Sequence, residues 1–242
     1  MNISPKTLYL TGLFAAVLGA GNPAEAVPVT LTKLTGVTGA VGGETAVFAA
    51  SLNALAGSFA AIVIRDSGST TGGSAGQFSG FDLDSIKLSF TNCATAACAQ
   101  TAVGLNVFDF FGGATVFTPG TQRAPADAKL FGTTASGSSV NNTVATLGSF
   151  DAVSSTGSDA TGFMSMGDGG QLAFNLTSLT STANLYLYIG EVGDNGEAAA
   201  SSISLLETPV PAIPEPSTVA LMLLGLAGLG AILGAQARRR SQ

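Results

Sequence analysis

The sequence predicts a mainly β protein: a two-sheet antiparallel β-sandwich, jelly-roll-like in arrangement, followed by a C-terminal transmembrane helix. Three observations lead to this prediction. Short β-prone runs recur along the chain, and clusters of Gly, Pro, Asn and Ser separate them. No amphipathic pattern long enough for a helix precedes residue 218. One long apolar run without charges, residues 219–235, lies near the end of the 242-residue chain.

The first 26 residues have the features of a secretory signal peptide. Lys6 supplies the positive charge, residues 8–18 are mostly apolar, and Ala24-Glu25-Ala26 forms a small-residue cleavage site. An N-terminal membrane anchor is the alternative, but the apolar run is too short for one. We therefore expect cleavage before Val27 and an exported domain over residues 27–208.

The predicted strands alternate apolar and polar side chains with period two. Val27, Val29 and Leu31 begin this pattern, with Pro28 tolerated near the start of a strand. The clearest alternation is over residues 184–190, where leucine and isoleucine face one way and Tyr186 and Tyr188 the other. The predicted strands cover residues 27–31, 45–51, 59–64, 77–90, 101–110, 115–118, 129–131, 144–150, 172–176, 184–190 and 202–206.

The run over residues 77–90 changes phase in its middle. Leu83 and Ile86 are both apolar but differ by an odd number of positions, which predicts a β-bulge at Asp84 and Ser85. Asp82 and Asp84 then project together beside the bulge. Two adjacent carboxylates repel unless they are solvated or bridged by a cation such as calcium. We favour two solvated acids at a strand edge, because carboxylates are mostly exposed.

The two cysteines of the chain, Cys93 and Cys98, are five positions apart. In an exported protein this spacing favours one disulfide that closes a hairpin loop between the strand over residues 77–90 and the strand over residues 101–110. A zinc site would need two further Cys or His ligands, which the sequence lacks. A redox pair of the thioredoxin type would need Cys-x-x-Cys at the start of a helix. We therefore predict a structural disulfide.

The segment 191–197 is expected to join the last two strands. Asp194-Asn195-Gly196 is strong turn chemistry, since Asn and Gly accept positive φ, and it predicts a tight hairpin. The alternative is a loop stabilised by calcium, with oxygens from Glu191, Asp194 and Glu197. The pattern is not that of an EF-hand.

The last part of the chain, residues 209–242, places three features in order. In the motif Pro214, Glu215 and Pro216, the two prolines prevent helix formation. The run 219–235 spans about 25 Å as a helix, and Arg238, Arg239 and Arg240 follow it. A bilayer core is about 30 Å thick, and the arginine cluster marks a membrane stop on the cytoplasmic side. A buried core helix is disfavoured because the run has no polar face.

This order of motif, span and basic tail resembles the PEP-CTERM sorting signal of Gram-negative bacteria. The resemblance implies that an exosortase recognises Pro214, Glu215 and Pro216 while the inner membrane transiently anchors the chain. Processing would then deliver the domain to the cell surface or the extracellular matrix. The resemblance concerns the destination of the domain and not its activity.

The amino-acid composition argues against several classes of function. The chain has no histidine and no tryptophan, so Ser-His-Asp triads, Cys-His pairs and histidine-ligated metal centres are excluded. Between residues 27 and 213, five Lys and Arg stand against thirteen Asp and Glu without a basic cluster, which argues against a nucleic-acid partner.

We expect a protein that is not an enzyme and has no cofactor, with calcium as the one candidate ligand. The predicted role is structural or adhesive, in exopolysaccharide or biofilm, with extracellular polysaccharide as a possible partner. The alternative is a calcium-dependent or glycan-binding, lectin-like module, with Tyr186 and Tyr188 as exposed rings. A second alternative is a carboxylate-based glycoside hydrolase, which would need two acids facing each other across a cleft.

Overall fold

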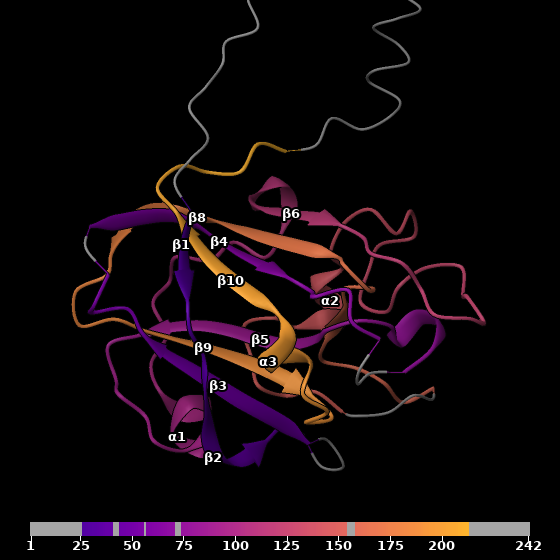
Figure 1. Cartoon of the computed structure of the whole chain (residues 1–242), viewed down its shortest axis with the longest axis horizontal. Coiled ribbons are helices and arrows are strands. Elements are labelled where there is room, and N and C mark those ends of the chain that lie inside the picture. Colours follow the sequence, from indigo (N-terminus) through magenta and orange to yellow (C-terminus); the bar gives the residue numbers. More distant parts are fainter. Residues whose placement is uncertain (1–25, 41–43, 56, 71–73, 154–157, 213–242) are drawn as a thin grey trace, which may run out of the picture.

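A computed structural model describes residues 26–40, 44–55, 57–70, 74–153 and 158–212. Two five-stranded sheets face each other, and all their strand pairs are antiparallel. Figure 1 shows them as an upper and a lower layer, and we use these names below. The mainly β, two-sheet antiparallel prediction is therefore confirmed.

The upper sheet has the strand order β1-β10-β4-β8-β6. Its strands are β1 (Ala26–Val29), β10 (Ser202–Leu206), β4 (Ser58–Arg65), β8 (Gln171–Ser181) and β6 (Thr115–Thr118). The lower sheet has the order β2-β3-β9-β5-β7. Its strands are β2 (Thr32–Thr38), β3 (Thr45–Ser51), β9 (Tyr186–Val192), β5 (Asp82–Ser89) and β7 (Met164–Ser165).

Short helices lie in the connections between strands. They are α1 (Ala96–Thr101), α2 (Asn142–Ala145) and α3 (Glu197–Ala200), with 3-10 turns η1 (Gly76–Phe78) and η2 (Gly112–Ala114). No helix of the described residues is long and apolar enough to cross a membrane. The predicted span, residues 219–235, lies outside the part of the chain that the structure describes.

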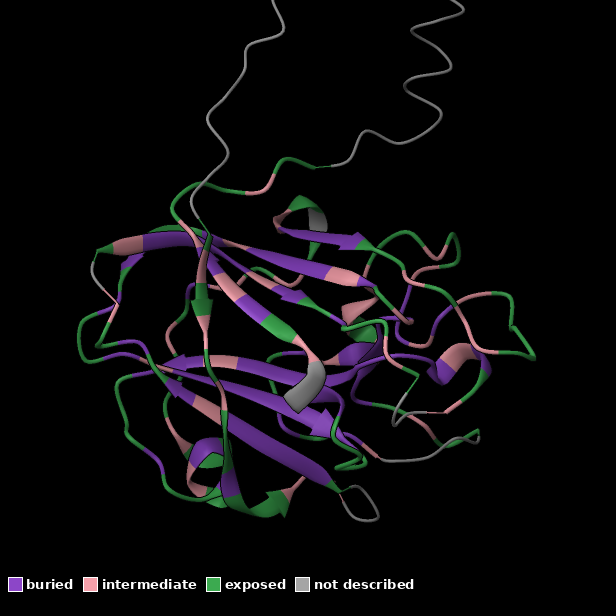
Figure 2. Cartoon of the chain, viewed as in Figure 1, coloured by how far each residue is buried: buried purple, intermediate pink, exposed green. Residues whose placement is uncertain are grey.

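The hydrophobic core lies between the two sheets, as the buried strands in Figure 2 show. Ile62 and Phe174 enter it from the upper sheet, and Leu83 and Ile189 enter it from the lower sheet. Alternate residues of each strand face the core, which is the geometry that period two predicts. A second apolar cluster covers the outer face of the lower sheet, where Phe150 and Tyr188 pack beside α1.

The predicted β-bulge is present in β5. Leu83 lies opposite Glu191, and Ile86 lies opposite Ile189, so two residues of β5 face the single residue between them in β9. Because the extra residue restores the phase, Leu83 and Ile86 both reach the core.

Three predicted strands are wrong: residues 101–110, 129–131 and 144–150 do not form strands. The Thr95 hydroxyl accepts a hydrogen bond from the Cys98 N–H and caps α1, which ends at Thr101. Two strands went unpredicted. β2 contains three threonines and is largely exposed, and β7 has only two residues, so neither has a usable hydrophobic alternation.

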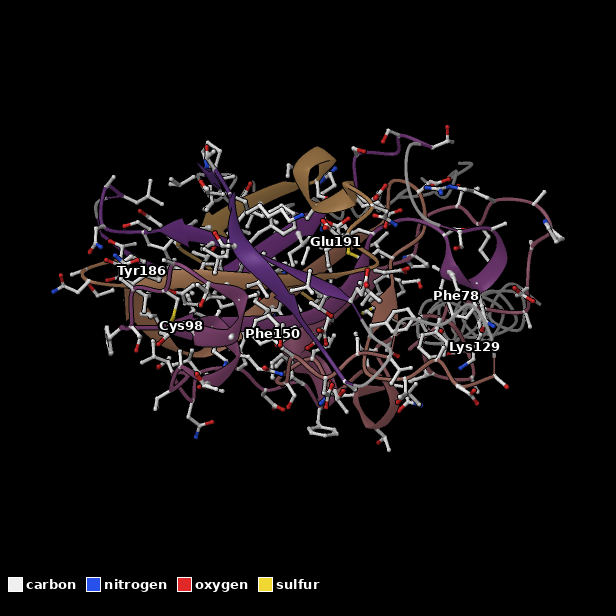
Figure 3. The ribbon with its side chains drawn as sticks, turned by 90° about the horizontal axis from the view of Figure 1, so that it is seen from below. Phe78, Cys98, Lys129, Phe150, Tyr186 and Glu191 are labelled. Carbon is white, nitrogen blue, oxygen red and sulfur yellow. A yellow bond between two sulfur atoms is a disulfide. The ribbon has the colours of Figure 1, made fainter. Side chains whose placement is uncertain are left out.

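The disulfide prediction is confirmed, since Cys93 and Cys98 are bonded. The bond joins the segment before α1 to the helix itself, rather than closing a hairpin between two strands. Figure 3 shows Cys98, Phe150 and Tyr186 together on the outer face of the lower sheet.

Candidate functional site

Asp84 is buried beneath a loop, in contrast to the solvated position that the sequence predicts. Its carboxylate accepts hydrogen bonds from the Thr45 hydroxyl at 2.7 Å and from the backbone N–H groups of Asp151 and Ala152 at 3.2 Å. Burial raises the pKa of Asp84 to about 7, although these hydrogen bonds act in the opposite direction. Asp84 therefore ties β5 to β3 and to the loop at 151–152.

Asp82 is also buried, so the prediction of a solvated acid is wrong here too. Its partner is the Ser165 hydroxyl of β7, the edge strand that covers this end of β5. Burial raises the pKa of Asp82 well above its usual range, and the charges of Glu197 and Glu191 raise it further. The two aspartates have separate partners, so the structure does not bring them together around one cation.

The segment 191–197 connects the two sheets and is not a hairpin. β9 belongs to the lower sheet and β10 to the upper one, so the chain must cross between layers here. Asp194 turns outward and pairs with Lys33 at 2.6 Å, whereas Glu191 and Glu197 are buried. The hairpin prediction failed because turn chemistry fixes the local bend but not the partner of the next strand.

Glu191 and Glu197 form a buried acidic pair at the end of β9. The Glu197 N–H donates to Oε1 of Glu191 at 2.7 Å. Among the described residues, Oε2 of Glu191 and both carboxylate oxygens of Glu197 have no hydrogen-bond partner. Burial raises the pKa of Glu191, and it raises the pKa of Glu197 to about 7. These oxygens are poorly suited to carrying charge.

Arg123 lies beside this pair and was not singled out from the sequence. Its Nε and Nη2 atoms bind the Asp168 carboxylate at 2.7 to 3.0 Å, and Nη2 lies 3.7 Å from Oε1 of Glu197. The Asp168 carboxylate raises the pKa of Arg123. The one feature of the sequence that could have drawn attention to Arg123 is the small number of basic residues, since it is one of only five in the domain.

The loops that hold Arg123 meet at a close backbone contact. The Asp66 carboxylate accepts hydrogen bonds from the N–H groups of Gly68, Gly169 and Phe81. Gly80 and Gly167 lie against each other here, both with φ of +75°. Because Asp66 binds three segments at once, it anchors the start of the glycine-rich stretch that follows it.

The arrangement of the described acidic residues bears on whether they could hold a metal ion. In the described part of the chain, no group of three Asp, Glu, Cys or His side chains is arranged to hold a metal ion. Glu191 and Glu197 are 0% and 3% exposed, so they do not face a cleft that a sugar chain can enter. Glu197, whose pKa burial raises to about 7, can bind and release a proton near neutral pH.

Tyr188 is fully buried, which corrects the prediction of two exposed tyrosines. Its hydroxyl donates to the Thr91 carbonyl and accepts from the Cys93 N–H at 2.9 Å. Only Tyr186 remains partly accessible. The pair therefore offers no stacking platform for a glycan.

Replacing Tyr188 by phenylalanine is expected to lower the free energy of unfolding by about 2 kcal/mol, because the buried Cys93 N–H and the partly buried Thr91 carbonyl lose their partner. The measurement is the urea unfolding midpoint. Tyr186→Phe is the control, since no hydrogen bond of its hydroxyl is found in the described structure, and we expect it to stay within about 0.5 kcal/mol of the parent. Equal effects of the two substitutions would contradict this role for Tyr188.

Residues 208–211 follow β10 and run over the outer face of the upper sheet. Figure 1 shows this segment in yellow above the sheet, near the start of β1. It borders a hollow of about 470 Å³, whose other walls include Val63, Gln171 and Ser204. The Asn175 side chain of β8 holds Val210 through two hydrogen bonds, at 2.7 and 2.9 Å.

The PEP-CTERM protein-sorting motif matches residues 212–240, directly after this segment. The chain therefore carries a PEP-CTERM sorting motif at its C-terminal end. The match covers the predicted motif Pro214, Glu215 and Pro216 and the arginines 238–240, all of which lie outside the described residues. The motif supports export, sorting by an exosortase at the membrane, and subsequent surface location. No curated protein and no solved structure matches the chain.

Proposed function

We propose that the folded domain of this protein is a non-catalytic, structural or adhesive component of an extracellular polysaccharide matrix. The sorting motif at residues 212–240 carries the proposal, because it directs the attached domain to the outside of the cell. The signal peptide predicted over residues 1–26 agrees with that route.

The architecture of the domain supports a passive role. Four acidic side chains of the lower sheet and the α3 segment, which are the chemically distinctive groups of the domain, are buried: Asp82, Asp84, Glu191 and Glu197. The strand orders β1-β10-β4-β8 and β3-β9-β5-β7 support a jelly-roll arrangement. A jelly roll with short edges and buried acids is suited to persistence outside the cell rather than to turnover of a substrate.

The test is the intact mass and location of the protein in its native host. We expect a species that begins at Val27, ends near Pro214, Glu215 and Pro216, and sediments with the extracellular polymer. Deleting the gene should reduce the mass or cohesion of that matrix. Two results together would refute the matrix role and leave sorting intact. They are a processed protein that stays free in the medium of the parent strain, and an unchanged matrix in the deletion mutant.

Glycan binding is the second candidate function, and one surface feature favours it. A hollow of about 340 Å³ is lined by Lys87, Asn106, Phe108 and Phe110, among others. The rings of Phe108 and Phe110 are nearly parallel, with centroids 5.5 Å apart, and both are partly exposed. Titration of the purified protein with host polysaccharide, with and without calcium, tests this candidate. An unchanged melting temperature under both conditions would exclude it.

A further inference from the structure

We propose that Asn175 slows the sorting reaction by restraining the chain just before the sorting motif. Its side chain holds residues 208–211, which we call the C-terminal strap, on the folded domain. The strap thereby limits how much of the chain before Pro214 an exosortase can reach. This inference depends on sorting by exosortase and not on the matrix role proposed above.

The first argument is the geometry of the contact. Oδ1 of Asn175 accepts from the Val210 N–H at 2.7 Å, and Nδ2 donates to the Val210 carbonyl at 2.9 Å. Both backbone groups of one residue are thus satisfied by one side chain, as a neighbouring strand would satisfy them. Phe174 and Leu176 on either side face the core, so Asn175 projects from the outer face of β8.

The second argument is the path of the strap across the sheet. Leu206 of β10 pairs with Ala61 of β4, and Ala61 pairs with Asn175 of β8, so these three residues form one row across the sheet. The chain leaves β10 after Leu206 and reaches Asn175 at Val210, and this path crosses Ala61. Ala61 faces away from the core and still has no exposed surface. The strap is therefore part of the folded domain.

The docked strap leaves only a short stretch of chain, which we call the tether, between the folded domain and Pro214. Pro214 is the fourth residue after Val210, so the chain between them extends to at most about 14 Å. If the strap is released, the tether begins at Leu206, and its eight residues extend to about 28 Å. An exosortase acts at the membrane, next to the apolar run that begins at Val219. A docked strap keeps the folded domain close to the enzyme, so we expect processing to proceed mainly from the released strap.

Asn175→Ala in the full-length protein is the primary test, with pulse-chase conversion of precursor to processed form in the native host as the readout. Loss of two hydrogen bonds raises the population of released strap on the order of 10-fold, and conversion should accelerate by up to that factor. Gln171→Ala is the matched control. Gln171 lies on the same face of β8 and borders the same hollow, but its side chain does not bind the strap. We expect this variant to convert within about twofold of the parent rate, an allowance that covers a small surface effect.

Two further measurements distinguish loss of the Asn175 restraint on the strap from a folding defect. Hydrogen exchange at the Val210 amide of the processed protein should show protection in the parent and loss of protection in Asn175→Ala. A second variant inserts four Gly and Ser residues after Ala212, which lengthens the tether while leaving Asn175 and the strap unchanged. It should also convert faster. The proposal is overturned if Asn175→Ala frees the Val210 amide without accelerating conversion, or if the insertion leaves the rate unchanged or lower.

Discussion

Replacing Gly80 by alanine is expected to destabilise the domain by about 2–5 kcal/mol. A Cβ at this position would overlap the backbone carbonyl of Gly167 and lie 2.7 Å from its nitrogen. The overlap is with main chain, which cannot rotate away, so the loops at 80 and 167 must separate. Overpacking of this kind costs about 1–3 kcal/mol, and the left-handed φ of +75° adds about 1–2 kcal/mol.

Gly169→Ala isolates the steric part of this effect. Gly169 has the same φ of +75°, but a Cβ there would meet no atom within 4 Å. We expect this control to lose about 1 kcal/mol, from backbone strain alone. Chemical denaturation of both variants gives the comparison. If Gly80→Ala is no less stable than Gly169→Ala, the loops are not in close contact and the assignment fails.

Separation of these loops should also disrupt hydrogen bonds beyond the two glycines. Asp66 binds Gly169 and Phe81 in the same region, and Arg123 binds Asp168 one residue after Gly167. Because a natural domain has only about 5–15 kcal/mol of stability, a loss of this size brings Gly80→Ala close to unfolding at 37 °C. Near-UV circular dichroism would report the loss of packing directly.

The stability of the domain is expected to fall as the pH rises from about 5 to about 7. Burial raises the pKa of Glu197 from its ordinary 4.5 to about 7, the Glu191 charge acts in the same direction, and Arg123 opposes it. A raised carboxyl pKa means that the folded state binds more protons than the unfolded state between these values. The stabilisation that comes from protonated Glu197 is therefore fully present below the pKa of this group in the unfolded state. It is lost as the pH rises through the pKa of the group in the folded state.

Glu197→Gln removes this ionisation while keeping the shape of the side chain. We expect the variant to match the parent at pH 5 and to exceed its free energy of unfolding by about 2 kcal/mol at pH 8, because each pKa unit corresponds to about 1.4 kcal/mol. Urea unfolding at both pH values is the measurement. Glu207→Gln makes the same chemical change at an exposed position, and its pH dependence should follow that of the parent.

A less stable Glu197→Gln at pH 8 would contradict this account. It would mean that the Glu197 carboxylate is bound in its charged form, with Arg123 at 3.7 Å as the nearest described cation. Asp84, whose pKa is also raised to about 7, remains in the variant, so part of the parental pH dependence should persist. Complete loss of the pH dependence would assign all of it to Glu197.

Several features followed from local sequence alone. The strands at Thr45–Ser51, Thr115–Thr118 and Ser202–Leu206 have the predicted bounds, because period-two alternation and flanking turn residues are local signals. The bulge in β5 was visible as a phase change, and the disulfide as a spacing between two cysteines. The sorting motif is likewise read as a linear order of residues.

The candidate sites depended on contacts between distant segments. Asp82 and Asp84 look like surface acids until β7 and the loop at 151–152 cover them, 67 to 83 residues further along the chain. Tyr188 looks exposed until Thr91 and Cys93 lie over its hydroxyl. A pattern with period two specifies which residues share a face, but not whether that face is covered.

Sequence by itself thus determined the β class, the disulfide and the sorting motif, since each depends on neighbours in the chain. Tertiary structure decided that the turn at Asp194 leads to the other sheet, because strand pairing is set by the whole core. It also decided that Asn175 meets Val210, 35 residues away, and that Glu191 and Glu197 are enclosed together. Burial and pairing are properties of the assembled sheets, and no local pattern specifies them.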